Sequence, residues 1–109
     1  MIARLWRGVV RSEDADRYRD YLHETGIPDY QATPGNLGVS ILQRETDQGV
    51  EFSALTFWDS MESIRAFAGD DPSIARYYPA DDEFLLFKEP NVQHFEVPYT
   101  TLPIAGAGG

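Results

Sequence analysis

One segment, residues 52–69, constrains the fold of this chain more than any other, because it passes directly from a buried strand into a capped helix. Its first part, residues 52–58, is rich in aromatic and β-branched residues with almost no charge, which predicts a central strand covered on both faces. Asp59 and Glu62 follow at the capping-box spacing and predict the start of the helix. Gly69 can adopt a left-handed conformation without steric cost, so it predicts the end of the helix.

The rest of the chain carries the signals of three further strands and of one longer helix. Residues 13–25 predict an amphipathic helix that Ser12 caps, and Gly26 and Pro28 are expected to end it. The turn residues 47–49 predict that the second and third strands form an antiparallel hairpin. The further strands are expected at residues 2–10, 37–44 and 92–97, and short helical pieces at 73–78 and from 81 to near Phe87.

This order of elements, β-α-β-β-α-β, predicts an α+β protein with the ferredoxin-like fold, a four-stranded antiparallel sheet with both helices on one face. The other face would expose a large apolar area on a monomer, so we expect a homodimer through sheet-to-sheet packing. The side chains expected on that face include Trp6, Leu42, Leu55, Phe57 and Phe95. One domain is expected over residues 1–99, followed by a short C-terminal tail over residues 100–109.

Composition excludes several classes of function. The formal net charge is −9 and Lys88 is the only lysine, so we expect no nucleic-acid partner and no binding to anionic membranes. The chain has no cysteine, which removes disulfides and thiolate chemistry and fits a cytoplasmic protein. Residues 1–7 contain two arginines and do not resemble a signal peptide, and no stretch is long and apolar enough to span a membrane.

Metal sites are not expected either, because the two histidines lie far apart in the sequence and no metal-binding spacing is present. Two acidic pairs, Asp70-Asp71 and Asp81-Asp82, resemble acid/base or metal carboxylates. Each pair precedes an expected helix start, so helix capping is the favoured interpretation.

With this topology, the sequence Leu-Thr-Phe-Trp-Asp-Ser-Met-Glu-Ser-Ile-Arg-Ala-Phe-Ala-Gly at residues 55–69 resembles the antibiotic biosynthesis monooxygenase superfamily of dimeric α/β barrels. The resemblance runs from Met1 to about Tyr99, and it includes Tyr-Tyr-Pro at residues 77–79 and His-Phe-Glu-Val at residues 94–97. It implies a homodimer whose two sheets face each other, with a pocket between each sheet and its helices. Some members of the superfamily oxygenate polycyclic phenols or quinols without a cofactor, others degrade haem, and many have no established activity.

The haem-degrading branch is disfavoured by three positions. Its members carry an asparagine on the first strand, a tryptophan in the second helix and a histidine just after that helix. This chain has Trp6 or Arg7, Phe67, and Tyr77 or Tyr78 at the corresponding places. Haem degradation is therefore disfavoured, although tyrosine ligates haem iron in other folds, and we expect no cofactor.

Three polar residues are the candidate catalytic groups. His94, the only histidine on a predicted strand, is a candidate base, because imidazole titrates near neutral pH. Tyr78 is a candidate donor to a substrate oxygen, and Arg4 is a candidate substrate anchor. Each has a structural alternative: His94 as a hydrogen-bonded histidine near the interface, Tyr78 as a packing residue, and Arg4 as the partner of Glu96 in an ion pair.

The candidates for substrate binding are aromatic, since 13% of the chain is Phe, Trp or Tyr and these rings must fill either a core or a pocket. They are Trp58, Trp6, Phe67 and Tyr77. We expect a cofactor-independent monooxygenase acting on a small aromatic, phenolic or quinone-like molecule. The alternatives are a non-catalytic barrel that binds a small molecule and a purely structural dimerisation module.

Overall fold

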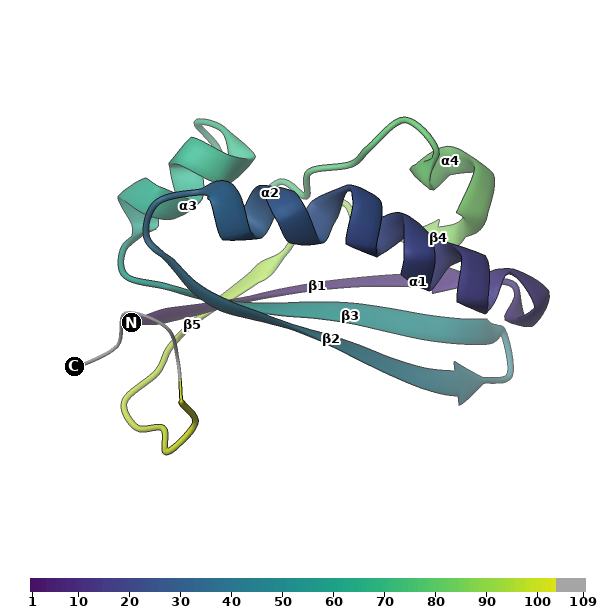
Figure 1. Cartoon of the computed structure of the whole chain (residues 1–109), viewed down its shortest axis with the longest axis horizontal. Coiled ribbons are helices and arrows are strands. Elements are labelled where there is room, and N and C mark those ends of the chain that lie inside the picture. The colour runs from purple at the N-terminus through teal and green to yellow at the C-terminus, as the bar shows by residue number, and fades with distance from the viewer. Residues whose placement is uncertain (104–109) are drawn as a thin grey trace.

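Three long strands and two short ones form a single antiparallel sheet in the computed structural model, which describes residues 1–103 (Figure 1). The sheet has the order β2-β3-β1, and β4 and β5 both pair with the free edge of β1. The strands are β1 (Ile2–Val10), β2 (Asn36–Thr46), β3 (Gly49–Trp58), β4 (Leu85–Lys88) and β5 (Gln93–Glu96). The helical elements are a 3₁₀ turn (Ser12–Asp14), α1 (Ala15–Glu24), α2 (Gly26–Ala32), α3 (Met61–Ala68) and α4 (Asp81–Phe84).

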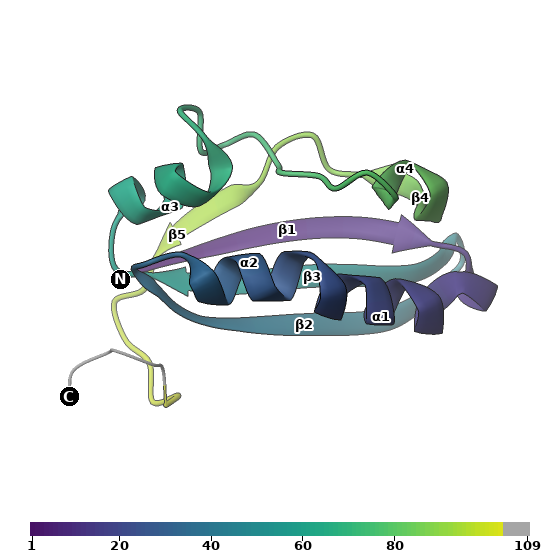
Figure 2. The same ribbon diagram turned by 45° about the horizontal axis from the view of Figure 1, so that its top comes forward.

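The helices cover one face of the sheet and leave the other face open (Figure 1, Figure 2). This arrangement confirms the predicted α+β, ferredoxin-like fold and the hairpin between β2 and β3. The fourth strand of the fold is divided into β4 and β5, because Pro90 between them has no backbone N–H to donate to the ladder. The part of the expected tail from residue 104 to 109 lies outside the described residues.

The even-numbered residues of β1 and β3 face the helices and form the core with them, for example Val10, Phe52 and Trp58. The odd-numbered residues of these two strands face the open side. Trp6 is therefore on the helix side of the sheet, where it is 8% exposed, and the expectation that it lies on the open face was wrong. The sequence left this choice undetermined, because β1 carries apolar residues at both parities.

The cap of α3 differs from the predicted one. Ser60 caps this helix, and its Oγ accepts a hydrogen bond from the Ser63 backbone N–H at 3.2 Å. Asp59 lies between the end of β3 and this helix, and its N–H donates to the Gly35 carbonyl at 2.9 Å. Its carboxylate accepts hydrogen bonds from the hydroxyls of Ser60 and Ser63, at 3.0 and 2.6 Å. Gly69, with φ of 103°, ends the helix as predicted.

The first helical region does not end at Gly26 and Pro28, as the sequence predicted, but bends and continues as α2. The bend lies at Thr25, whose φ and ψ are −119° and −82°. Pro28 is in the first turn of α2, where a backbone N–H would have no acceptor within the helix.

Residues 73–78 do not form the predicted helix, because their backbone is bound to the segment before β5. The Ala75 N–H donates to the Pro90 carbonyl at 3.1 Å, and the Val92 N–H donates to the Ser73 carbonyl at 2.7 Å. Tyr78 also precedes Pro79, which disfavours helical backbone at this position.

The helix predicted from residue 81 ends at Phe84, and residues 85–88 form β4 instead. This segment is strand because its backbone pairs with β1 at Gly8, Val9 and Val10. In residues 1–103, no helix has the length and apolar character needed to cross a membrane.

Candidate functional site

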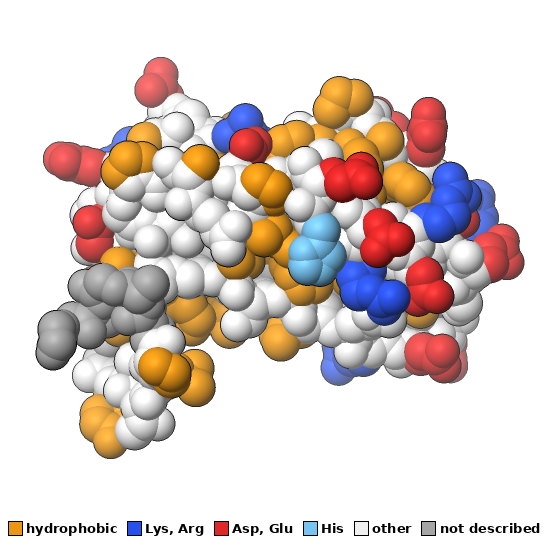
Figure 3. Space-filling model, viewed as in Figure 1, with side chains coloured by type: hydrophobic (Ala, Val, Ile, Leu, Met, Phe, Trp, Pro, Cys, Tyr) orange, Lys and Arg blue, Asp and Glu red, His pale blue; other side chains and the backbone are white. Residues whose placement is uncertain are grey.

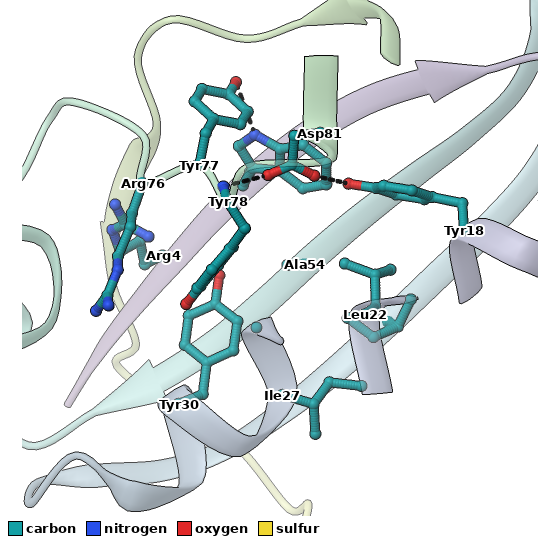
Figure 4. A pocket seen from close by; sticks show the side chains of 13 residues that line it. Arg4, Tyr18, Leu22, Ile27, Tyr30, Ala54, Arg76, Tyr77, Tyr78 and Asp81 are labelled. Atoms are coloured by element: carbon teal, nitrogen blue, oxygen red, sulfur yellow. Dashed lines mark hydrogen bonds between the residues drawn. The ribbon is translucent and has the colours of Figure 1, made fainter. Parts of the chain in front are cut away.

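A small pocket lies between the sheet and the pair α1 and α2, under the connection of residues 69–80 that joins α3 to α4 (Figure 4). The space open to the centre of a water molecule is about 30 Å³. Such a space holds water but no aromatic ring, because a cavity that binds benzene is about 150 Å³. Side chains of β1, α1, α2 and the connection line it, among them Arg4, Trp6, Tyr18, Tyr30, Tyr77, Tyr78 and Asp81.

Arg4 is the buried cation of this pocket and is only 2% exposed. Its Nη2 donates to the Ile74 carbonyl at 3.3 Å, whereas its buried Nε has no hydrogen-bond partner among residues 1–103. Burial lowers the pKa of Arg4, yet a guanidinium remains protonated in proteins. The predicted pair with Glu96 is not formed, because the register places Glu96 opposite Ile2 and His94 opposite Arg4.

An aromatic stack supports one wall of the pocket. The ring of Tyr30, which lines the pocket, stacks on Phe67 with centroids 4.5 Å apart. Trp58 lies against both rings and donates from Nε1 to the Thr56 hydroxyl at 2.8 Å. Phe67 and Trp58 thus lie behind Tyr30, so in this conformation they hold the wall rather than line the cavity. Burial raises the pKa of the Tyr30 hydroxyl, and the Arg4 charge opposes this rise.

Trp6 and Tyr77 form a second wall. The Trp6 Nε1 donates to the Tyr77 hydroxyl at 3.0 Å, and that hydroxyl donates to the Glu89 carbonyl. The two rings meet edge to face with centroids 6.1 Å apart. This contact ties the connection between α3 and α4 to β1.

Tyr78 closes the pocket on the side of α2. Its hydroxyl donates to Asp29 Oδ2 at 2.6 Å, and Nη2 of Arg76 lies 3.3 Å from the same oxygen. Burial and the bond to Asp29 raise the pKa of Tyr78. The hydroxyl that the sequence suggested as a donor to substrate is therefore bound to Asp29 in this conformation.

Asp81 and Tyr18 belong to the pocket, although the sequence favoured helix capping for Asp81 and did not single out Tyr18 as a site residue. The Asp81 carboxylate accepts hydrogen bonds from the Tyr18 hydroxyl at 3.1 Å and from the Tyr78 backbone N–H at 2.6 Å. Burial raises the pKa of Asp81. No sequence pattern separates Asp81 from its exposed neighbour Asp82; the one available signal was Tyr18 on the apolar stripe of its helix, because a buried tyrosine hydroxyl needs a partner.

His94 lies beside Arg4 but does not line the pocket. Within the described part of the chain its buried Nε2 has no hydrogen-bond partner. Burial, and to a lesser extent the Arg4 charge, lower the pKa of His94, so the ring is neutral at pH 7. Of the seven predicted site residues, the structure gathers Arg4, Trp6, Tyr77 and Tyr78 around one pocket and places His94, Trp58 and Phe67 outside its lining. No group of acidic residues and histidines in residues 1–103 is arranged to hold a metal ion.

Comparison with known proteins identifies the fold through solved structures. No protein-family profile matches the chain, and no curated protein matches its sequence. A variant of MhuD, with two manganese protoporphyrin IX molecules bound per active site, matches with a TM-score of 0.64 and 17% identity over 93% of this chain and 98% of that one. A structure from Bacillus cereus carries the name antibiotic biosynthesis monooxygenase. It has a TM-score of 0.63 and 15% identity over 94% of this chain and 95% of that one.

A similarly named structure from Nitrosomonas europaea has a TM-score of 0.63 and 14% identity over 91% of this chain and all 100% of that one. The chain thus has the fold of the antibiotic biosynthesis monooxygenase-type proteins, as the resemblance in its sequence implied.

Proposed function

We propose that this protein is a cofactor-independent monooxygenase that binds a small phenolic or quinone-like molecule in the pocket beside Arg4. The observation that carries the proposal is the buried Nε of Arg4, a donor without an acceptor in an aromatic-lined pocket. Leaving a buried donor unpaired costs about 1–3 kcal/mol, so a ligand oxygen at this position would be strongly favoured. The fold shared with monooxygenase-type proteins is consistent with this chemistry.

An oxygen that loses its proton beside a buried guanidinium makes the attached ring electron-rich, and such an anion reacts with dioxygen. For a ring with an acidic CH2 group the overall reaction is CH2 + O2 → C=O + H2O, in which dioxygen is the oxidant. Arg4 stabilises the anion. The rings of Trp6 and Tyr77 exclude water from the anion.

Entry of a substrate requires the pocket to expand, because the present cavity of about 30 Å³ is smaller than one aromatic ring. At Arg76 and Tyr78 the wall is held to α2 through side chains, by their bonds to Asp29. We infer that this side opens when a ligand enters.

We also propose that two copies pack through their open sheet faces. Leu42 and Phe95 lie on this face and are each 49% exposed. Hydrophobic side chains emerge along the lower margin of the molecule in Figure 3, where the open side of the sheet lies in Figure 1. A homodimer would remove this apolar surface from water.

The residues of the pocket do not fit a haem. Within residues 1–103 no histidine lines the pocket, and the hydroxyls of Tyr18, Tyr77 and Tyr78 already donate to Asp81, Glu89 and Asp29. The porphyrin bound by the MhuD variant is also far larger than this cavity.

A structural dimerisation module is the second candidate, and the filling of the pocket favours it. The rings of Tyr30 and Tyr78 project into the space in which a ligand would lie (Figure 4). In that case the open sheet face is the functional surface. A non-catalytic barrel would bind the same class of ligand in the expanded pocket but would not oxidise it.

The test is to incubate the purified protein with a panel of anthrones and hydroquinones in air, following oxygen uptake and quinone absorbance. We expect turnover that falls at least 100-fold in Arg4→Met and stays within twofold of wild type in Arg65→Met, which removes an exposed arginine of α3. Circular dichroism would check that both variants fold. Binding without oxygen uptake would replace the enzyme with a ligand-binding barrel, and neither binding nor uptake would leave the dimerisation module.

A further inference from the structure

A carboxylate lies at the end of the pocket opposite Arg4, and the proposed reaction has not yet used it. Figure 4 shows Arg4 at one side, Asp81 bonded to Tyr18 at the other, and the ring of Tyr78 between them. Asp81 and Arg4 both line this pocket. The pocket therefore places a buried cation and a buried carboxylate at two separate ends.

The burial of Asp81 is unusual for a residue at the start of a helix. Asp81 is 4% exposed, and no arginine, lysine or histidine of residues 1–103 forms an ion pair with it. Lys88 of β4 pairs with Asp82 instead. Taking a carboxylate out of water without a cation is costly, even when it accepts two hydrogen bonds.

Other aspartates of this chain that accept local hydrogen bonds stay exposed. Asp71 accepts one from the Ser73 N–H at 3.1 Å, Asp59 accepts one from the Ser63 hydroxyl at 2.6 Å, and both side chains remain in solvent. Local hydrogen bonds alone do not require burial, so the position of Asp81 in the pocket calls for another explanation.

Resting on the function proposed above, we propose that Asp81 is the proton acceptor of this site. The substrate would then carry an oxygen at the ring edge that meets Arg4 and an acidic C–H or O–H at the opposite edge, as an anthrone or a hydroquinone does. Asp81 is the catalytic base, and Tyr18 is a positioning residue that orients its carboxylate.

Protons and electrons balance in this step. The substrate C–H bond breaks, its proton moves to an Asp81 oxygen, and its electron pair is delocalised onto the ring oxygen beside Arg4. The carbanion carbon bonds to dioxygen, and the resulting peroxide takes the proton back from Asp81. Loss of water from this hydroperoxide, with the second hydrogen of the CH2 group, leaves the ketone.

The surroundings of Asp81 suit a base that works near neutral pH. Burial raises the pKa of Asp81, which brings a carboxyl closer to the pH at which it must accept a proton. The titratable and charged groups that face it are Tyr18 of α1, Tyr30 of α2, Tyr77 and Tyr78 of the connection, Lys88 of β4, and Asp82 of its own helix. The hydrogen bonds from Tyr18 and Tyr78, with the charge of Lys88, favour the ionised form, whereas burial and Asp82 oppose it.

Asp82 offers a matched control, because it is the next residue in the same short helix but is exposed. In the anthrone assay we expect Asp81→Asn to lower kcat/KM by about 100- to 10,000-fold, the range for removing a general base. In the pH profile of kcat/KM, the wild-type value should fall at low pH as Asp81 becomes protonated. This acid limb should be lost in Asp81→Asn. Asp82→Asn should keep the rate within twofold and should retain an acid limb, moved slightly to lower pH because the Asp82 charge that opposes ionisation of Asp81 is gone.

A second variant keeps the inference testable if Asp81→Asn fails to fold. Tyr18→Phe removes one hydrogen bond that stabilises the ionised carboxylate, so the acid limb should move to higher pH. A structural role for Tyr18 alone would lower stability without moving the limb. An unmoved limb in Tyr18→Phe, or a normal limb in Asp81→Asn, would overturn the role of Asp81 while leaving the oxygenase in place.

Binding without oxygen separates this inference from the proposed function. Under anaerobic conditions, the anion band of a bound anthrone should form with wild-type protein and not with Asp81→Asn. Anion formation without turnover in air would sink the oxygenase but support the base. Turnover in air by wild-type protein whose bound anthrone forms no anion would refute the base alone.

Discussion

The shape of the pocket wall depends on a single glycine in β1. The Trp6 ring lies over Gly8, and a Cβ atom added there would be 2.7 Å from Cη2 and Cζ2 of Trp6. It would also be 2.8 Å from Cδ2 of Leu85 in β4. Only a residue without a side chain lets the indole lie along the strand and reach Tyr77.

We therefore expect Gly8→Ala to destabilise the protein by about 1–3 kcal/mol, the usual range for overpacking a core. Its matched control is Gly38→Ala in β2, where an added Cβ would meet nothing within 4 Å. Urea unfolding of both variants would measure the difference. Equal stability of the two would show that the Trp6 ring can move away at little cost.

At the scale of elements, the connection between α3 and α4 is fixed in two different ways. Its first half pairs through the backbone with the segment before β5, through Ser73 and Ala75. Its second half is held mainly by side chains, with Tyr78 and Arg76 both bonded to Asp29 of α2. Truncating a side chain leaves the backbone hydrogen bonds of the first half in place. The bonds of the second half converge on one carboxylate, which a single substitution removes.

We expect Asp29→Ala to loosen only the second half of this connection. Stability should fall by about 1 kcal/mol, because the ion pair is partly exposed and one charged hydrogen bond is lost. Amide hydrogen exchange should quicken at residues 76–80 and not at Ser73 or Ala75. Asp16→Ala, which removes an exposed ion pair with Arg19 on α1, is the control and should change neither. Uniformly faster exchange along the connection would contradict this division.

Local signals in the sequence predicted the long strands and also β5, but not two of the short segments. Strand β3 and helix α3 were predicted nearly to their bounds, because their apolar spacing and Gly69 act within a few residues. Residues 73–78 and 85–87 were predicted as helix, and both predictions were wrong. Backbone hydrogen bonds set both conformations: residues 85–88 pair with β1, and the Ala75 N–H donates to the Pro90 carbonyl. These partners are not neighbours in the sequence, so local patterns do not predict them.

At the scale of the whole molecule, the two faces of the sheet have different roles. The helix side holds the core and the pocket, while on the open side Phe57 is 8% exposed but Leu42 and Phe95 are each 49% exposed. The net charge of −9 adds long-range repulsion between copies, so association must depend on apolar contact across this face.

We expect the 12.3 kDa chain to sediment as a dimer at micromolar concentration, and Leu42→Glu with Phe95→Glu to convert it to a monomer. The two substitutions place charges within the proposed interface on the two outer strands of the sheet, β2 and β5, where burial of a charge is unfavourable. Ile74→Glu is the control, because Ile74 is similarly exposed, at 52%, but lies on the connection beside the helices. A monomeric wild type, or a dimer that survives the double substitution, would refute the sheet-to-sheet arrangement.

The sequence by itself determined the fold class, the hairpin and the aromatic character of the interior, because periodicity, turns and caps act between near neighbours. It also singled out Arg4, Trp6, Tyr77 and Tyr78, four of the residues that meet at the pocket. Only the tertiary structure decided which face of β1 is buried, that Arg4 lies opposite His94 rather than Glu96, and that Asp81 is buried while Asp82 is not. These outcomes depend on strand register and on packing between distant segments, which a linear pattern of residue types does not encode.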